Sequence, residues 1–152
     1  MLNQDHQEGE EGGNGNVKYG TVIRLKVRLD YKGYPRPNRF FFGGKKTEEV
    51  AAEIRDQKAT LWRNVPLQGV RIEEVQPYEI YTVLEGEEEE EVAYAPLELI
   101  LAANSLEDCV FIVVREEFRT LEILEPLSLT FSAREMEKLF FRFSEALKNL
   151  KK

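Results

Sequence analysis

The chain has 152 residues, of which 42% are hydrophobic and 32% charged, and its formal net charge is −7. No stretch approaches the ~18 consecutive apolar residues that a membrane-spanning helix needs, so we expect no membrane partner. The single cysteine, Cys109, excludes an internal disulfide framework and is typical of a cytoplasmic protein.

Residues 1–16 are polar, acidic and rich in glycine. Such a segment buries too little apolar surface to offset the entropy lost on ordering. We therefore predict a disordered acidic tail over 1–16 and a single domain over 17–150.

The first folded element is a strand that begins at Ile23. Apolar residues at 23, 25, 27 and 29 alternate with polar ones, which is the period of a half-buried strand. Two prolines and a glycine then predict an irregular loop over 31–38, and 39–42 is expected to form a second strand.

A helix is predicted over 48–62, with Thr47 as its cap and Pro66 after its end. Its inward face would carry Val50, Ala51, Ile54, Leu61 and Trp62. The alternative is a strand over 49–56.

Further strands are expected over 69–76 and 78–84, separated by Pro77, and the acidic run that ends at Glu91 would form a solvated loop tip. Residues 92–103 fit a strand or a short helix. The apolar run 109–114 predicts a central buried strand, and 119–125 and 127–131 predict two more.

The last element is an amphipathic helix. Ser132 and Glu135 have the spacing of a capping box. An apolar stripe follows at helical spacing and would cover one face of a sheet; it consists of Met136, Leu139, Phe140, Phe143, Leu147 and Leu150. The fold class predicted is α+β: a mostly antiparallel sheet of five to seven strands covered by this helix.

We find no catalytic motif, metal site or cofactor site, and we predict that the protein is not an enzyme. The only histidine, His6, lies in the predicted tail, and Cys109 opens an apolar run, where burial would raise its pKa. The Gly43–Thr47 segment lacks the spacing of a phosphate-binding P-loop. Its glycines and lysines before a helix still fit a weak anion-binding site, but a strand-to-helix turn that needs glycine geometry is the favoured explanation.

The distribution of charge is uneven. Residues 17–46 hold nine basic residues and one acidic residue, a net +8, so the remainder of the chain carries −15. Such asymmetry is a sign of polyanion binding. The residues expected to bind single-stranded nucleic acid or another polyanion, by phosphate contacts and base stacking, are Arg24, Lys26, Arg28, Tyr31, Lys32, Tyr34, Arg36, Arg39, Lys45 and Lys46. The competing interpretation pairs the strand cations with acids on neighbouring strands, such as Glu73, Glu79 or Glu122.

Phe141 departs from the apolar stripe of the last helix. It lies about 100° from Phe140 around the helix axis, among Arg134, Lys138 and Glu145. A large exposed aromatic residue often marks a contact surface, so Phe141 is a candidate protein contact.

The stretch from Pro37 to Pro96 resembles a family of short, uncharacterised bacterial domains that are sometimes encoded beside translesion DNA polymerases. The matching points are Arg39-Phe40, Gly44, Ile54, Asp56, Trp62 and 78–86. The resemblance implies a bacterial source, a strand rather than a helix over 49–56, and some support for nucleic-acid binding.

Two functions are therefore expected. The first is a non-enzymatic binding module whose basic strand and loop, residues 24–46, bind a polyanion. The alternative is a homo-oligomeric or partner-binding domain that uses the C-terminal helix and sheet edges.

Overall fold

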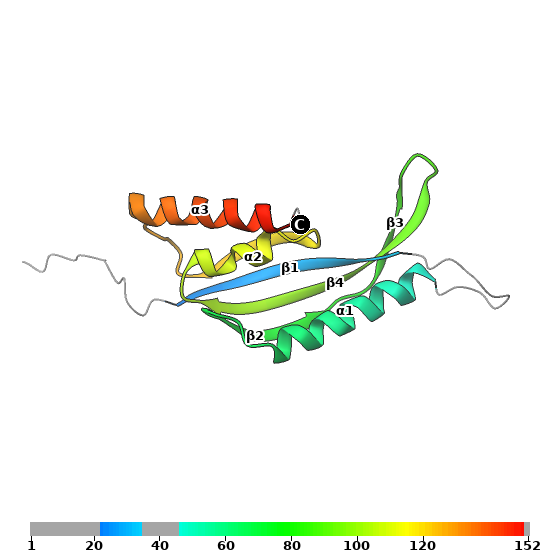
Figure 1. Ribbon diagram of the computed structural model, residues 1–152. Helices are drawn as coiled ribbons and strands as arrows, with labels where there is room; N and C mark the ends of the chain where they lie inside the picture. The colour runs from blue at the N-terminus through cyan, green and yellow to red at the C-terminus, as the bar shows by residue number, and fades with distance from the viewer. Residues whose placement is uncertain (1–21, 35–45, 151–152) are drawn as a thin grey trace, which may run out of the picture.

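The computed structural model describes residues 22–34 and 46–150 of the chain (Figure 1). The elements in chain order are β1 (Ile23–Gly33), α1 (Thr47–Asn64), β2 (Val70–Pro77), β3 (Tyr81–Glu85), β4 (Glu90–Ala103), the 3-10 helix η1 (Leu106–Cys109), α2 (Val110–Val113), β5 (Phe118–Glu125) and α3 (Ala133–Leu150). The predicted tail over 1–16 and the predicted strand over 39–42 lie outside the described residues.

The strands form one antiparallel sheet in the order β2-β4-β1-β5, and β3 pairs with the first half of β4. The α+β class and the five-stranded antiparallel sheet with a C-terminal helix confirm the prediction from sequence. Residues 92–103, for which sequence left two interpretations, belong to the long central strand β4.

Pro96 lies inside β4 at the point where β2 has ended and β3 has not begun. Its carbonyl accepts the N–H of Tyr78 at 3.1 Å. Because both backbone groups of one strand residue point to the same edge, the missing N–H of Pro96 faces this break and leaves no ladder bond unmade.

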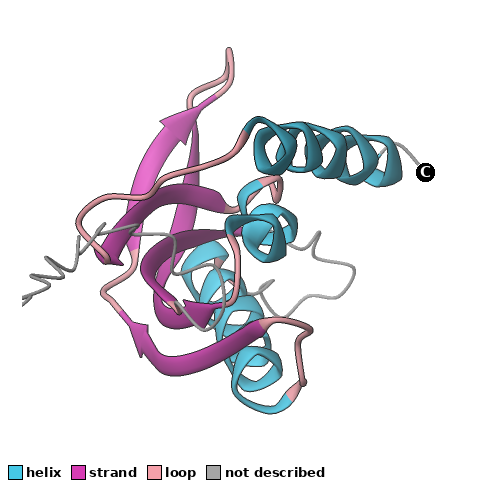
Figure 2. Cartoon of the chain, turned by 90° about the vertical axis from the view of Figure 1, so that its left-hand side faces the viewer, coloured by secondary structure: helices cyan, strands magenta, loops and turns pink. Residues whose placement is uncertain are grey.

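The helices lie on the side of the sheet that receives the odd-numbered side chains of β1. Figure 2 shows the strands curving around α1 and α2, with α3 beyond them. α1 packs against β1, β4 and β2, whereas α3 packs on η1 and α2. The core between these layers is centred on fully buried leucines at 25, 29, 97, 99 and 101.

The helix predicted over 48–62 is confirmed as α1, so the strand over 49–56 that the family resemblance implies is wrong. Two details of the prediction are also wrong. Leu61 is 50% exposed, and Ala59 is buried in its place. Thr47 does not cap the helix: its hydroxyl donates to the carbonyl of Gly33 and accepts the N–H of Ala93, which links β1 to β4.

Three other predicted boundaries are corrected. β1 continues through 31–33, where a loop was expected. The run 109–114 is buried at Cys109, Val110 and Ile112, but it is helical rather than a strand, because it closes one end of the core. Residues 127–131 form no strand; there the chain leaves the sheet for α3, and Leu129 packs on the core.

The serine half of the predicted capping box is present at the start of α3. The N–H of Glu135 donates to Ser132 Oγ at 3.1 Å, and the Ser132 hydroxyl donates to the Glu135 carboxylate at 3.2 Å. Among the described helices, none is long and apolar enough to cross a membrane.

Candidate functional site

The basic side chains of β1 share the face of the sheet opposite the helices. This face holds Arg24, Lys26 and Arg28, because polar and apolar residues alternate along the strand. In the pairing of β1 with β4 and β5 these residues lie among the carboxylates of the neighbouring strands.

Each of these cations is paired with a carboxylate. Arg24 reaches across β4 to Glu73 of β2 at 3.1 Å and lies 3.6 Å from Glu125 of β5. Lys26 is 3.8 Å from Glu122, also on β5. Of the three acids that the competing interpretation named, Glu73 and Glu122 are confirmed as partners, whereas Glu79 forms none of the ion pairs described for these cations.

Arg28 and Lys32 are paired in the same way. Arg28 donates from Nε to Asp30 at 2.9 Å, and Lys32 Nζ donates to Glu85 at 2.7 Å. The hydrogen bonds to these carboxylates raise the pKa of both cations. The four basic side chains of β1, at positions 24, 26, 28 and 32, therefore stay positively charged, and each is neutralised by a carboxylate in direct contact.

Asp30 is the centre of a polar cluster at the base of the β3–β4 hairpin. It is only 4% exposed, and it accepts a 2.5 Å hydrogen bond from the hydroxyl of Tyr81. Arg119 Nε lies 3.7 Å from the same carboxylate. Buried carboxylates are retained when they are paired and hydrogen-bonded, and this one meets both conditions.

A second carboxylate, Glu85, joins the same cluster. It accepts hydrogen bonds from Lys32 and from the hydroxyl of Tyr94, and these bonds lower its pKa. The rings of Tyr81 and Tyr94 are stacked with centroids 5.5 Å apart. Burial raises the pKa of both tyrosines, so both act as neutral hydrogen-bond donors. The cluster ties β3 to β1, which is a structural task.

The remaining residues predicted to bind a polyanion are dispersed. Tyr31 is buried in the core at 4% exposure, so its ring cannot stack on a nucleic-acid base. The predicted stacking role of Tyr31 is therefore wrong. Tyr34 is 54% exposed, with Lys32 Nζ 5.0 Å from its ring centroid. Lys46 is exposed directly before α1. Arg36, Arg39 and Lys45 lie outside the described residues.

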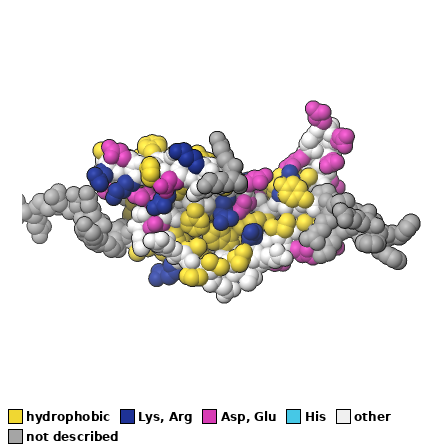
Figure 3. Space-filling view, viewed as in Figure 1, with side chains coloured by type: hydrophobic (Ala, Val, Ile, Leu, Met, Phe, Trp, Pro, Cys, Tyr) yellow, Lys and Arg dark blue, Asp and Glu magenta, His cyan; other side chains and the backbone are white. Residues whose placement is uncertain are grey.

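Within residues 22–34 and 46–150, no three histidine, cysteine, aspartate or glutamate side chains are grouped so that they could hold a metal ion. Cys109 is 2% exposed, and burial raises its pKa to about 11. The expectation of a buried thiol is therefore confirmed. Figure 3 shows the acidic side chains of the β3–β4 hairpin projecting at its tip, apart from one another and from the helices.

No protein-family model and no curated protein matches this chain.

The C-terminal helix carries the other candidate surface. None of its 18 residues is buried. Phe140, Phe141, Leu147 and Leu150 are 67%, 66%, 52% and 56% exposed, respectively. The prediction that the apolar stripe would be covered is therefore only partly met: Met136, Leu139 and Phe143 are half-buried, and the rest of the stripe faces solvent.

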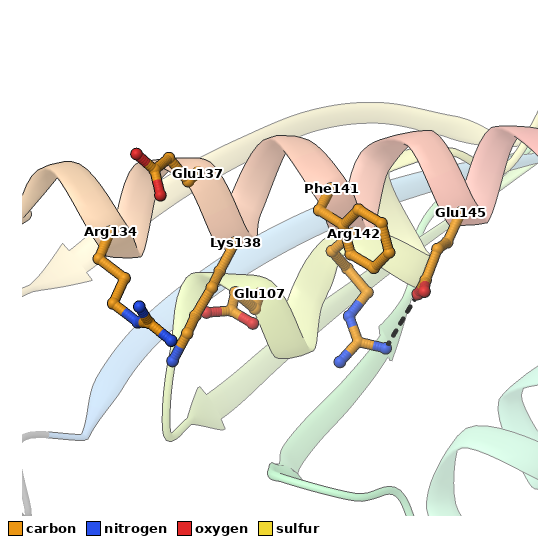
Figure 4. Close-up of a pocket in the computed structure, with 7 residues that line it drawn as sticks. All are labelled: Glu107, Arg134, Glu137, Lys138, Phe141, Arg142 and Glu145. Atoms are coloured by element: carbon orange, nitrogen blue, oxygen red, sulfur yellow. Dashed lines mark ion pairs between the residues drawn. The ribbon is translucent and has the colours of Figure 1, made fainter.

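Phe141 is exposed, as predicted, and stands on the polar side of α3. Figure 4 shows its ring beside Arg142, while Arg134 and Lys138, farther along α3, reach toward Glu107 of η1. These residues line an open hollow of about 600 Å³. Arg142 and Glu145 form an ion pair at 3.7 Å within it. The hollow offers matched charges and one aromatic ring.

Sequence reasoning had missed the exposure of Phe140 and Leu147. It assigned the whole stripe to the core because its spacing is that of a core-facing helix. No signal within the helix itself distinguishes a stripe that meets its own core from one that meets another chain.

Proposed function

We propose that this chain is a non-enzymatic protein-interaction domain of the cytoplasm that binds its partner through the solvent-facing part of the α3 stripe. We call this part the α3 surface: Phe140, Leu147 and Leu150. The observation that carries the proposal is that each of these side chains is more than half exposed on a helix with no buried residue.

The energetic argument starts from the helix alone. Most of the stability of a helix in a protein comes from the packing of its apolar face rather than from the helix alone. α3 has the cap and the apolar face of such a helix, yet only part of that face meets η1 and α2. A partner that covers Phe140 and Leu147 would supply the missing packing, at roughly 25 cal/mol for each Å² of apolar surface removed from water.

The experiment uses the full chain as bait for a displayed library of amphipathic helical peptides. We expect selected peptides to bind the native chain and to lose at least tenfold in affinity toward Phe140→Glu. Phe141→Glu is the matched control, since both residues are phenylalanines of nearly equal exposure on one helix. Equal losses in the two variants, or no selected peptide, would contradict the proposal.

Polyanion binding through residues 24–46 is the second candidate. It is supported by the net charge of that segment and by the exposure of Tyr34 and Lys46. It is weakened by the ion pairs of Arg24, Lys26, Arg28 and Lys32, because a phosphate would have to displace a carboxylate from each of them. Titration of labelled single-stranded DNA and RNA at two salt concentrations tests it, and no binding at low salt would remove it.

A further inference from the structure

We infer that the partner is a second copy of this chain, and that two α3 helices pack antiparallel across a twofold axis between Phe140 and Phe143. This inference rests on the proposed function, since it uses the α3 surface, extended by Ala133 and by the half-buried Met136 and Phe143, and names its occupant. It is carried by the spacing of the apolar residues, by the charges beside them and by the exposure of α3.

The apolar residues of α3 follow a heptad pattern. They alternate at spacings of three and four along the whole helix: Ala133, Met136, Phe140, Phe143, Leu147 and Leu150. This is the spacing of a seam between two helices rather than of a broad face against a sheet. Leu139 and Ala146 lie beside the seam, on the flank toward α2. Ala146 and the last seam residue, Leu150, line a hollow together with Val110 and Phe111 of α2.

An antiparallel pairing makes the seam self-complementary. It sets Phe140 of one copy against Phe143 of the other, and Met136 against Leu147. At the ends it sets the smallest residue of the seam, Ala133, against Leu150. Every layer therefore holds one residue from each half of the helix, and the central layers hold four phenylalanine rings.

The charges beside the seam favour the same direction. Glu137 and Lys148 lie within about 20° of each other around the helix, on the flank turned away from α2. In the antiparallel pairing, Glu137 of one copy comes level with residue 146 of the other, about 3 Å along the axis from Lys148. A parallel pairing instead places these flanks of the two copies on opposite sides of the seam, so it brings no Glu137–Lys148 pair together.

The size of the surface predicts a weak dimer. α3 is roughly 27 Å long and presents a strip about 10 Å wide, which is well below the ~800 Å² that each partner contributes to a standard stable interface. The segment before α3 adds Leu127 and Phe131, which are 102% and 37% exposed. We therefore expect the dimer to dissociate on dilution.

Sedimentation equilibrium of the full chain from about 10 μM to 1 mM tests the stoichiometry. We expect a monomer–dimer equilibrium whose dissociation constant rises at least tenfold in Phe140→Glu and stays within twofold in Phe141→Glu. Circular dichroism confirms that both variants fold, as the exposure of both side chains predicts. Dissociation by Phe141→Glu rather than Phe140→Glu would overturn the seam and favour the polar side of α3.

Disulfide cross-linking tests the direction. Cys109 is buried, so a cysteine introduced in α3 is the only accessible thiol among the described residues. A mixture of Ala133→Cys and Leu150→Cys chains is expected to cross-link, whereas Leu150→Cys chains alone are not. Efficient linkage of Leu150→Cys with itself would overturn the antiparallel pairing.

The outcomes separate this inference from the function on which it rests. A chain that stays monomeric to 1 mM, but binds library peptides in a Phe140-dependent way, contradicts only the second copy as partner. A monomeric chain that binds no such peptide contradicts both.

Discussion

The indole Nε1 of Trp62 donates a hydrogen bond to the phenolic oxygen of Tyr31 at 3.0 Å. The two residues belong to α1 and β1, and they are 7% and 4% exposed. The Trp62 ring also lies 6.1 Å, centroid to centroid, from Phe111 of α2. One polar contact inside an apolar core thus fixes where α1 lies on the sheet.

Removal of the Tyr31 hydroxyl should lower the free energy of unfolding by more than the loss of a solvent-exposed hydrogen bond would. Tyr31→Phe leaves the indole N–H without a partner in the core, so we expect the free energy of unfolding to fall by about 1–3 kcal/mol. Urea denaturation measures this change. The control is Tyr34→Phe at a side chain that is 54% exposed, for which we expect a change within about 0.5 kcal/mol.

The same tyrosine makes stability fall at alkaline pH. Burial is the main cause that raises the pKa of Tyr31 from 10.0 to about 12. Between these values the unfolded chain loses its phenolic proton and the folded chain keeps it, so the unfolded state is favoured. The stabilisation is complete below pH 10.0 and is lost as pH rises through about 12.

The measurement is urea denaturation at about pH 9 and about pH 11.5 for the native chain and for Tyr31→Phe. The loss of stability should be larger in the native chain by about 2 kcal/mol. Tyr81 and Tyr94, whose pKa values are also raised, are present in both proteins and cancel in the difference. Equal losses in the two proteins would show that Tyr31 titrates normally in the fold.

The first turn of α1 lies so close to Gly33, at the end of β1, that no side chain fits at this position. A Cβ at this position would lie 2.1 Å from the carbonyl oxygen of Thr47 and 2.6 Å from the amide nitrogen of Ala51. Both are backbone atoms of a helix, so α1 would have to move. We expect Gly33→Ala to lower the free energy of unfolding by about 3 kcal/mol or more.

Gly86 provides the control for this substitution. It has a φ of 78°, but a Cβ there meets nothing within 4 Å. Gly86→Ala should therefore cost only the conformational penalty, about 1–2 kcal/mol. Thermal or urea denaturation compares the two variants, and a smaller cost at Gly33 would contradict the close packing of α1 on β1.

The elements that sequence predicted well depend on local signals. The alternation from Ile23 to Leu29 has the period of a strand, and Ser132 accepts the free N–H of Glu135 three residues later. Neither requires knowledge of the rest of the chain, and both predicted elements are present.

The errors arise where tertiary packing decides between two local forms. The run from Cys109 to Val114 is apolar throughout, so it has no period to separate a buried strand from a buried helical turn. It closes the end of the core, where its Phe111 lies against Trp62 of α1, a place that only the assembled sheet defines.

The candidate basic site shows the same limit. The cationic stripe of β1 is visible in the sequence, but Arg24 meets Glu73 only because β2 and β1 both pair with β4. Strand order therefore decides whether the stripe is a free field or a set of ion pairs. The sequence alone shows the basic side chains of β1, but it does not decide whether carboxylates of neighbouring strands pair with them.

The Asp30 cluster should be essential for stability, unlike the exposed ion pairs. Asp30→Asn keeps the size of the side chain but removes the charge that faces Arg28 and Arg119, and it sets an amide against donors. We expect the free energy of unfolding to fall by about 2 kcal/mol, because charge-assisted hydrogen bonds to a buried carboxylate are lost.

Asp56→Asn is the matched substitution at an exposed pair. The Asp56 side chain is 69% exposed and lies 3.3 Å from Arg55, so its loss should change stability by less than about 0.5 kcal/mol. Urea denaturation in low and high salt compares the two variants, and only the Asp56 pair should be screened. If Asp30→Asn costs no more than Asp56→Asn, the cluster does not hold β3 to the sheet. Its cations would then be available to an anionic ligand, and polyanion binding would regain the support that these pairs remove.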